Sequence, residues 1–159
     1  MSTYIGPRAL VSRNARVAGN AIVSGNARVL GNARVLGNVI VAGNARVLGN
    51  AIVSDDARVA GNAIVSDDAH VSGNARVLGN AIVVGNAVIY GIKRSDGYVF
   101  CYVPCADKKW RVIAGCRYFT MEEATAHWLK TRKGTALGRE TMVILRCLEM
   151  LRKVKPGGV

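Results

Sequence analysis

The sequence contains few aromatic residues, few prolines and no long hydrophobic runs, and each of these features excludes some classes of protein. Only 6% of its 159 residues are aromatic and three are proline, although half are apolar. That apolar content is too high for an intrinsically disordered chain. No apolar run approaches the roughly 18–20 residues of a membrane-spanning helix, and the N-terminus lacks the features of a signal peptide. We therefore expect a cytoplasmic protein with no membrane partner, built as one domain or as a domain with a small appendage.

Cysteine and histidine are also scarce. The chain has four cysteines, all after residue 100, and two histidines. In a cytoplasmic chain of this kind we expect the cysteines to be reduced rather than bridged. Charge is strongly one-sided, because 22 Lys and Arg stand against 10 Asp and Glu and give a formal net charge of +12.

Positions 5 to 91 repeat with a period of six, as in VAGNAI, VSGNAR and VLGNAR. Most repeats carry Gly-Asn at the third and fourth positions, and the fifth position is alanine in all but one repeat, where Val39 replaces it. The first position is aliphatic in fifteen registers without an insertion: Ile5, valine at every sixth residue from Val11 to Val83, and Ile89. Such self-similarity predicts a repeat architecture.

The chemistry of each slot predicts a corner followed by a short strand. A Gly-Asn pair provides the positive φ angles that a sharp corner needs. Aspartate tolerates the same conformation, so Asp55-Asp56 and Asp67-Asp68 keep the corner and add charge. Between corners, alternation sends alanine and valine inward and the other two side chains outward. A helix is excluded because it needs apolar spacing near 3.6 and every corner would break it.

This pattern resembles the hexapeptide-repeat family. The resemblance implies a β-solenoid, specifically a left-handed, triangular parallel β-helix in which three hexads complete one coil. Residues 1–91 would then form about five coils, stacked about 4.8 Å apart. The resemblance also implies a homotrimer whose ligands sit in grooves between subunits.

With 18 residues per coil, the outward residues that precede each core valine fall into three columns. Arginine occurs in vertical pairs within these columns, and isoleucine does the same. The columns are Leu10, Arg28, Arg46, Ile64 and Ile82; Arg16, Arg34, Ile52, His70 and Val88; and Ile22, Ile40, Arg58 and Arg76. Residues 1–91 contain no lysine and no glutamate.

Stacked arginines suggest an anionic partner. Two arginines on neighbouring strands about 5 Å apart repel one another unless an anion lies between their guanidinium groups. Arginine binds phosphate and carboxylate in a planar, bidentate geometry. The alternative is that exposed arginines splay apart and were simply copied with the repeat. The candidate ligand-binding residues are Arg16, Arg34, Arg28, Arg46, Arg58, Arg76 and His70. The expected partner is a nucleotide-like anionic small molecule or a host protein.

An enzyme is disfavoured. Many proteins of the hexapeptide-repeat family are acyltransferases, which carry a catalytic histidine and often a long loop that projects from one coil. Here no register is interrupted, and His70 is the only histidine in the repeats. Zinc enzymes of this fold need three histidines at one metal. We therefore predict no catalytic residue, no metal and no cofactor, and keep acyltransferase as an alternative function.

Residues 92–159 are predicted to form a small, basic α+β domain that caps the repeats or binds a partner. They hold 14 basic and 6 acidic residues. Turn residues separate three extended segments, which predict an antiparallel meander: 88–93, 98–103 and 110–114.

Two helices should follow this meander. Thr120 and Glu123 have the spacing of a capping box, which predicts a helix to about Lys130. After a loop over 131–138, helical spacing of leucine and isoleucine predicts a second helix from 139 to about 154.

The stretch AGCRYFTMEEATAHW, Ala114–Trp128, resembles a segment of small phage and prophage proteins that carry GNARV-type repeats. The resemblance implies a phage or prophage origin, with the host cytoplasm as the location. It implies no particular chemistry.

Three further sites are weaker predictions. Cys101 and Cys105 should share a strand face and Cys116 could join them as a third zinc ligand, but buried free thiols are favoured. A Cys116–His127 nucleophile pair would require the two residues to be adjacent in space. The basic tail with its aromatic residues is compatible with nucleic acid, yet its lysines and arginines are dispersed, so nucleic acid is not favoured.

Together these features favour a non-enzymatic, homotrimeric phage or prophage binding protein that acts as a counter-defence sponge or inhibitor. The alternative outside this class is a structural or interaction module of a phage particle.

Overall fold

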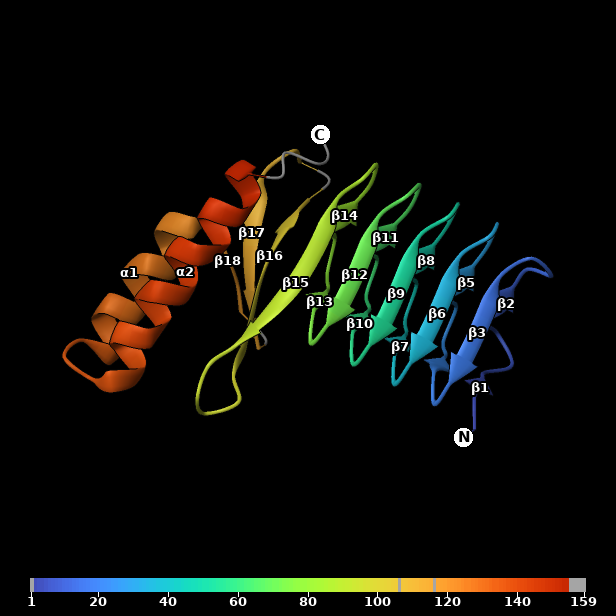
Figure 1. The fold of residues 1–159 in the computed structure, drawn as a ribbon, viewed down its shortest axis with the longest axis horizontal. Coiled ribbons are helices and arrows are strands. Elements are labelled where there is room, and N and C mark those ends of the chain that lie inside the picture. The colour runs from blue at the N-terminus through green and yellow to red at the C-terminus, as the bar shows by residue number, and fades with distance from the viewer. Residues whose placement is uncertain (1, 106, 116, 155–159) are drawn as a thin grey trace.

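The structure, a computed structural model, describes residues 2–105, 107–115 and 117–154 (Figure 1). The predicted β-solenoid is confirmed. About five turns carry three parallel sheets, and further strands and two helices follow at the C-terminal end. Within the described residues, neither helix combines the length and hydrophobicity needed to cross a membrane.

Each side of the solenoid is one parallel sheet, and each sheet takes one strand from every coil. Face 1 contains β1 (Tyr4–Ile5), β4 (Ile22–Val23), β7 (Ile40–Val41), β10 (Arg58–Val59) and β13 (Arg76–Val77). Face 2 contains β2 (Leu10–Val11), β5 (Arg28–Val29), β8 (Arg46–Val47), β11 (Ile64–Val65) and β14 (Ile82–Val83). Face 3 contains β3 (Arg16–Gly19), β6 (Arg34–Gly37), β9 (Ile52–Asp55), β12 (His70–Gly73) and β15 (Val88–Lys93).

The inward positions form the core that the repeat predicts. Every alanine and valine at these positions from Ala21 to Val83 is fully buried, and Val39 fits into the alanine column. Neighbouring strands pair so that each core residue lies beside its equivalent in the next coil, as Val23 does beside Val41. Burying one valine stabilises the fold by about 1.5–3 kcal/mol, and the repeat places one at almost every register.

The corners have the positive φ angles that Gly-Asn predicts. At Gly19, where φ is 85°, a Cβ atom would lie 2.7 Å from the carbonyl oxygen of Gly37 in the next coil. Asp55 also has positive φ (64°), and its carboxylate accepts a hydrogen bond from the Gly73 N–H at 2.9 Å. Asp67 makes the equivalent contact with Gly85 at 3.2 Å. These aspartates therefore join successive coils as well as forming corners.

Side-chain amides connect the coils along each corner. Asn20, for example, donates from Nδ2 to Oδ1 of Asn38 at 3.0 Å, and Asn26 donates to Asn44 at 3.2 Å. These ladders follow the 18-residue spacing that the sequence predicts. They add to the backbone hydrogen bonds that already join successive corners, such as that from Asn20 N–H to the Gly37 carbonyl at 2.9 Å.

The C-terminal region covers the last coil in two layers (Figure 1). From β15 the chain turns into an antiparallel sheet of β16 (Val99–Pro104), β17 (Trp110–Ala114) and β18 (Arg117–Phe119). Alternation along β16 places Cys101 and Val103 against the solenoid core and Phe100 in a second core with Trp128. The three predicted strands are confirmed, and β18 was not predicted.

Two helices, α1 (Met121–Arg132) and α2 (Ala136–Val154), form the outer layer. The capping box is confirmed, because Thr120 Oγ1 accepts from Glu123 N–H at 3.1 Å and Glu123 Oε2 accepts from Thr120 N–H at 2.8 Å. The predicted loop over 131–138 was too long. The second helix begins earlier because the Thr135 hydroxyl accepts from the Gly138 N–H at 3.0 Å, which satisfies a free donor of its first turn.

Candidate functional site

The structure places the arginines of each predicted pair side by side in neighbouring coils. The pairs are Arg28 and Arg46 on face 2, Arg16 and Arg34 on face 3, and Arg58 and Arg76 on face 1. All are exposed except Arg76, which is half-buried. Within residues 2–105, 107–115 and 117–154, none of these six guanidinium groups has an ion-pair partner. Each pair therefore concentrates positive charge that the described part of the chain does not neutralise.

The three pairs do not form one site within one chain, because each lies on a different face of the prism. His70 is exposed on face 3, where its strand neighbours are Ile52 and Val88. It therefore lies outside all three pairs. A site that needed several pairs at once would have to combine different subunits.

One pair borders a groove on the solenoid surface. Leu10, Arg28 and Arg46 line this groove from the strands of face 2, and the corner residues Asn26 and Asn44 line it as well. The groove also contains Asn62 and Arg8, and its volume is about 520 Å³. That volume falls within the roughly 300–1,000 Å³ of small-molecule sites. We call this feature, lined by Arg8, Leu10, Asn26, Arg28, Asn44, Arg46 and Asn62, the arginine groove.

Arg8 is the member that sequence reasoning missed. It occupies the corner position 18 residues before Asn26, in the same column as Asn26, Asn44 and Asn62. Counting the corner columns in steps of 18, as was done for the outward columns, would have found it. Arg8 adds a third guanidinium group to the groove from a second column.

Acidic residues are absent from the corner column that lines this groove. Asp56 and Asp68 belong to the other two corner columns, where they accept hydrogen bonds from Asn38 and Asn50 at 2.9 and 3.1 Å. The groove therefore presents three guanidinium groups and several amides, and no carboxylate is among its lining residues. Such a surface has a positive electrostatic potential. Its lining residues include no histidine, cysteine, serine or acid that would act as a nucleophile or general base.

Cys101 and Cys105 are buried and take part in packing. Cys101 and Cys105 lie on the strand face that meets the solenoid, as predicted. Cys101 Sγ accepts a hydrogen bond from the Arg76 N–H at 3.0 Å, and burial raises the pKa of this thiol to about 11. Cys116, and with it the predicted Cys116–His127 pair, lies outside the described residues. Among the residues that are described, no three His, Cys, Asp or Glu side chains gather as metal ligands would.

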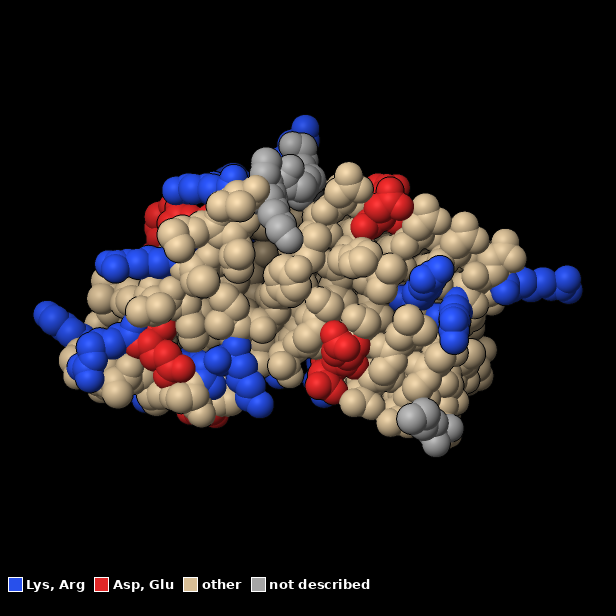
Figure 2. All heavy atoms as spheres, in the orientation of Figure 1, with Lys and Arg blue, Asp and Glu red and all other residues tan. Residues whose placement is uncertain are grey.

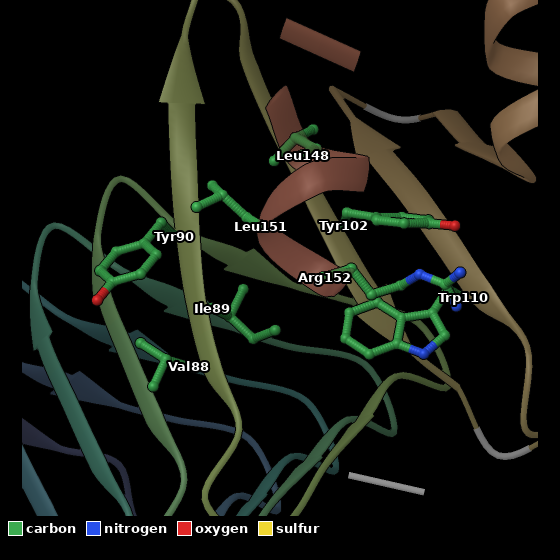
Figure 3. Close-up of a pocket in the computed structure, with 8 residues that line it drawn as sticks. All are labelled: Val88, Ile89, Tyr90, Tyr102, Trp110, Leu148, Leu151 and Arg152. Atoms are coloured by element: carbon green, nitrogen blue, oxygen red, sulfur yellow. The ribbon is translucent and has the colours of Figure 1, made fainter. Parts of the chain in front are cut away.

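A second hollow lies between the solenoid end and α2 (Figure 3). Its walls include Tyr102, Trp110 and Leu148. The Cζ atom of Arg152 lies 5.9 Å from the centroid of the Tyr102 ring and 5.7 Å from that of the Trp110 ring. The space inside is only about 30 Å³, which accommodates about one water molecule. Arg152 here completes the packing of the two layers through cation–π contacts.

Comparison with known proteins identifies the repeat and little more. The family described as "YdcK Beta solenoid repeat" matches residues 69–85. No curated protein and no solved structure matches the chain significantly. The matched segment contains all of β12, β13 and β14, so the similarity supports the solenoid. It says nothing about the chemistry of the solenoid surface.

Proposed function

We propose that this chain is a non-enzymatic binding protein that holds a phosphate-bearing, nucleotide-like small molecule in the arginine groove. The observation that carries this proposal is the groove itself. Arg8, Arg28 and Arg46 line it together, and no carboxylate lies among the lining residues. Arginine favours planar, bidentate contacts with phosphate oxygens.

The geometry favours an extended anion that lies along the solenoid axis. Arg28 and Arg46 occupy equivalent positions in successive coils, which are separated by about 4.8 Å. A ligand with more than one phosphate would meet one guanidinium group per coil. The amides of Asn26 and Asn44 would then contact its sugar or base.

A homotrimer is part of the proposal. Face 2 carries apolar side chains at both ends of the arginine pair, with Leu10 54% exposed at one end and Ile64 and Ile82 half-buried at the other. A second copy packed against this face would cover them and close the groove. Charge-assisted hydrogen bonds are stronger in such a partly dry site. In a phage-encoded protein, a ligand of this class would be a nucleotide signal and its capture a counter-defence.

Native mass spectrometry of protein purified from cells tests the subunit count and any retained ligand together. Thermal unfolding with a panel of cyclic and linear nucleotides tests binding. A ligand at 100 times its dissociation constant stabilises the folded state by about 2.7 kcal/mol, or about 5–10 °C for a domain of this size. No stabilisation by any member at millimolar concentration would contradict the proposal.

The chain offers a matched control for the site assignment. Arg28→Gln/Arg46→Gln removes the pair in the groove, whereas Arg58→Gln/Arg76→Gln removes an equivalent pair on another face. Both variants lose two positive charges. We expect the first to abolish the ligand-induced shift and the second to keep it. Equal loss in both variants would show that the ligand responds to total charge rather than to the groove.

A second candidate function, an interaction module for a host or phage protein, is favoured by one observation. The outer helix α2 exposes Val143 and Met150, with 64% and 62% of their surfaces accessible. A Val143→Asp/Met150→Asp variant would lose such a partner while it keeps nucleotide binding.

A further inference from the structure

Residues 117–128, which belong to the segment that resembles phage proteins, fold back on themselves in the structure. Arg117 lies on β18 and His127 on α1, and both line one hollow with Arg132 from the end of α1. The hollow has a volume of about 350 Å³. It lies in the C-terminal region and shares no lining residue with the arginine groove. We call it the C-terminal hollow.

Most other polar groups in this hollow already have partners. Arg94 is buried and binds the Asp96 carboxylate through two contacts of 2.6 and 2.9 Å. The Tyr98 hydroxyl donates to the Ala114 carbonyl at 2.8 Å, and the Thr131 hydroxyl donates to the carbonyl of His127 at 2.8 Å. Asp96 is the only acid among the lining residues, and Arg94 neutralises it.

Three basic side chains in the hollow have no hydrogen-bond or ion-pair partner in the described part of the chain: Arg117, Arg132 and His127. Figure 2 shows that Lys and Arg side chains also surround this helical end of the molecule. Two guanidinium groups and an imidazole around one cavity are a set of donors suited to a doubly charged oxyanion.

We propose that the C-terminal hollow is a second anion site, which binds a phosphate group through Arg117, His127 and Arg132. This site is independent of the proposed function of the arginine groove. The shared chemistry is a terminal phosphate, either free inorganic phosphate or a phosphomonoester. The volume admits a phosphate together with part of the molecule that carries it.

The surroundings of His127 support this assignment. Its ring packs at 5.2 Å from the Phe119 ring and at 5.0 Å from the Trp128 ring, which fixes its orientation. Partial burial, and then the positive charges of Arg117 and Lys130, lower the pKa of the imidazole. Charges that disfavour a protonated histidine favour an anion beside it. A bound phosphate dianion would offset these charges and raise the histidine pKa again.

The two histidines of the chain make a direct test possible. NMR titration of the imidazole signals of the full-length protein, with sodium phosphate replacing sodium chloride at constant ionic strength, compares His127 with His70. His70 is exposed on face 3 and serves as the internal reference. We expect phosphate to raise the pKa of His127 by about 0.5–1 unit in a saturable manner and to leave His70 unchanged.

Variants separate this site from a general charge effect. Arg117→Gln should raise the pKa of His127 without phosphate, because it removes a nearby positive charge, and should abolish the response to phosphate. Arg132→Gln should weaken the response. Arg146→Gln removes the same charge from an exposed position of α2 and should change nothing.

Any of three results would overturn the proposal. These are equal pKa shifts of His127 and His70, a response to phosphate that does not saturate, and equal effects of Arg117→Gln and Arg146→Gln. Repeating the titration with a nucleoside monophosphate distinguishes the sources of the phosphate. Tighter binding of the monophosphate indicates a carried phosphate, and equal or weaker binding indicates the free ion. Because the arginine groove is unchanged in all these variants, failure of this site would leave the proposed function standing.

Discussion

Replacing either Arg28 or Arg46 of the arginine groove with glutamate should stabilise the ligand-free protein and abolish ligand binding. Arg28 and Arg46 are direct neighbours on adjacent strands. At about 4.8 Å in water, screened by 0.15 M salt, two like charges repel by about 0.5 kcal/mol. Arg46→Glu converts this repulsion into an attraction of similar size. We expect the free energy of unfolding to rise by about 1 kcal/mol and the melting temperature by about 2–4 °C.

A double-mutant cycle measured by thermal and urea unfolding isolates this interaction. Arg28→Glu should stabilise the protein as Arg46→Glu does, and the double variant should return close to the wild type, because two carboxylates repel as two guanidinium groups do. In 1 M salt the gain of each single variant should fall by more than half. If both single variants are less stable than the wild type at low salt, the arginines have a structural role and the assignment of the groove as a ligand site is wrong.

Three further predictions concern the fold. Gly19→Ala should lower the free energy of unfolding, measured in urea, by about 1–3 kcal/mol more than Gly73→Ala does. Both glycines have positive φ, but only at Gly19 would the new Cβ meet the backbone of the next coil. Gly138→Ala should destabilise the protein by a similar amount, since its Cβ would overlap the preceding helix's last carbonyl, and circular dichroism would show the lower melting temperature. Hydrogen bonding to Arg94 lowers the pKa of Asp96 to about 2 from 3.8, so the stability that Asp96 provides is complete above about pH 4 and is lost as the pH falls towards 2. Asp96→Asn should therefore melt below the wild type at pH 7, and the difference should shrink as the pH falls to about 2 and vanish below that pH.

The solenoid was predictable from the sequence because its rules are local. The chain turns a corner at every sixth residue, and an aliphatic residue follows each alanine two positions later. A solenoid is the arrangement that buries both the alanine and the aliphatic columns. The first helix was predictable for the same reason, because Thr120 and Glu123 satisfy each other's backbone within one turn. The 18-residue coil also gave the neighbours of every outward residue, including Arg28 and Arg46.

The features that were missed depend on contacts between distant segments. The strand Arg117–Phe119 has no apolar alternation of its own and is held by pairing with β17, where Phe119 lies beside Val112. The C-terminal hollow joins this strand to the end of α1, which the spacing of the residues does not reveal. Arg8 is different, because it obeys the 18-residue rule and was missed only because the corner columns were not counted.

The fold does not determine where charged residues lie on the solenoid surface. The outward position before each core valine accepts Arg, Ile, His or Val with the same buried interior behind it. Stacking Arg28 on Arg46 therefore costs free energy that an isoleucine or a glutamate at either position would avoid. Figure 2 shows acidic side chains on other parts of the solenoid surface, and those at the corners bind neighbouring amides. An anion bound between Arg28 and Arg46 would offset their repulsion, and the charge-reversal cycle measures how large that repulsion is in the empty protein.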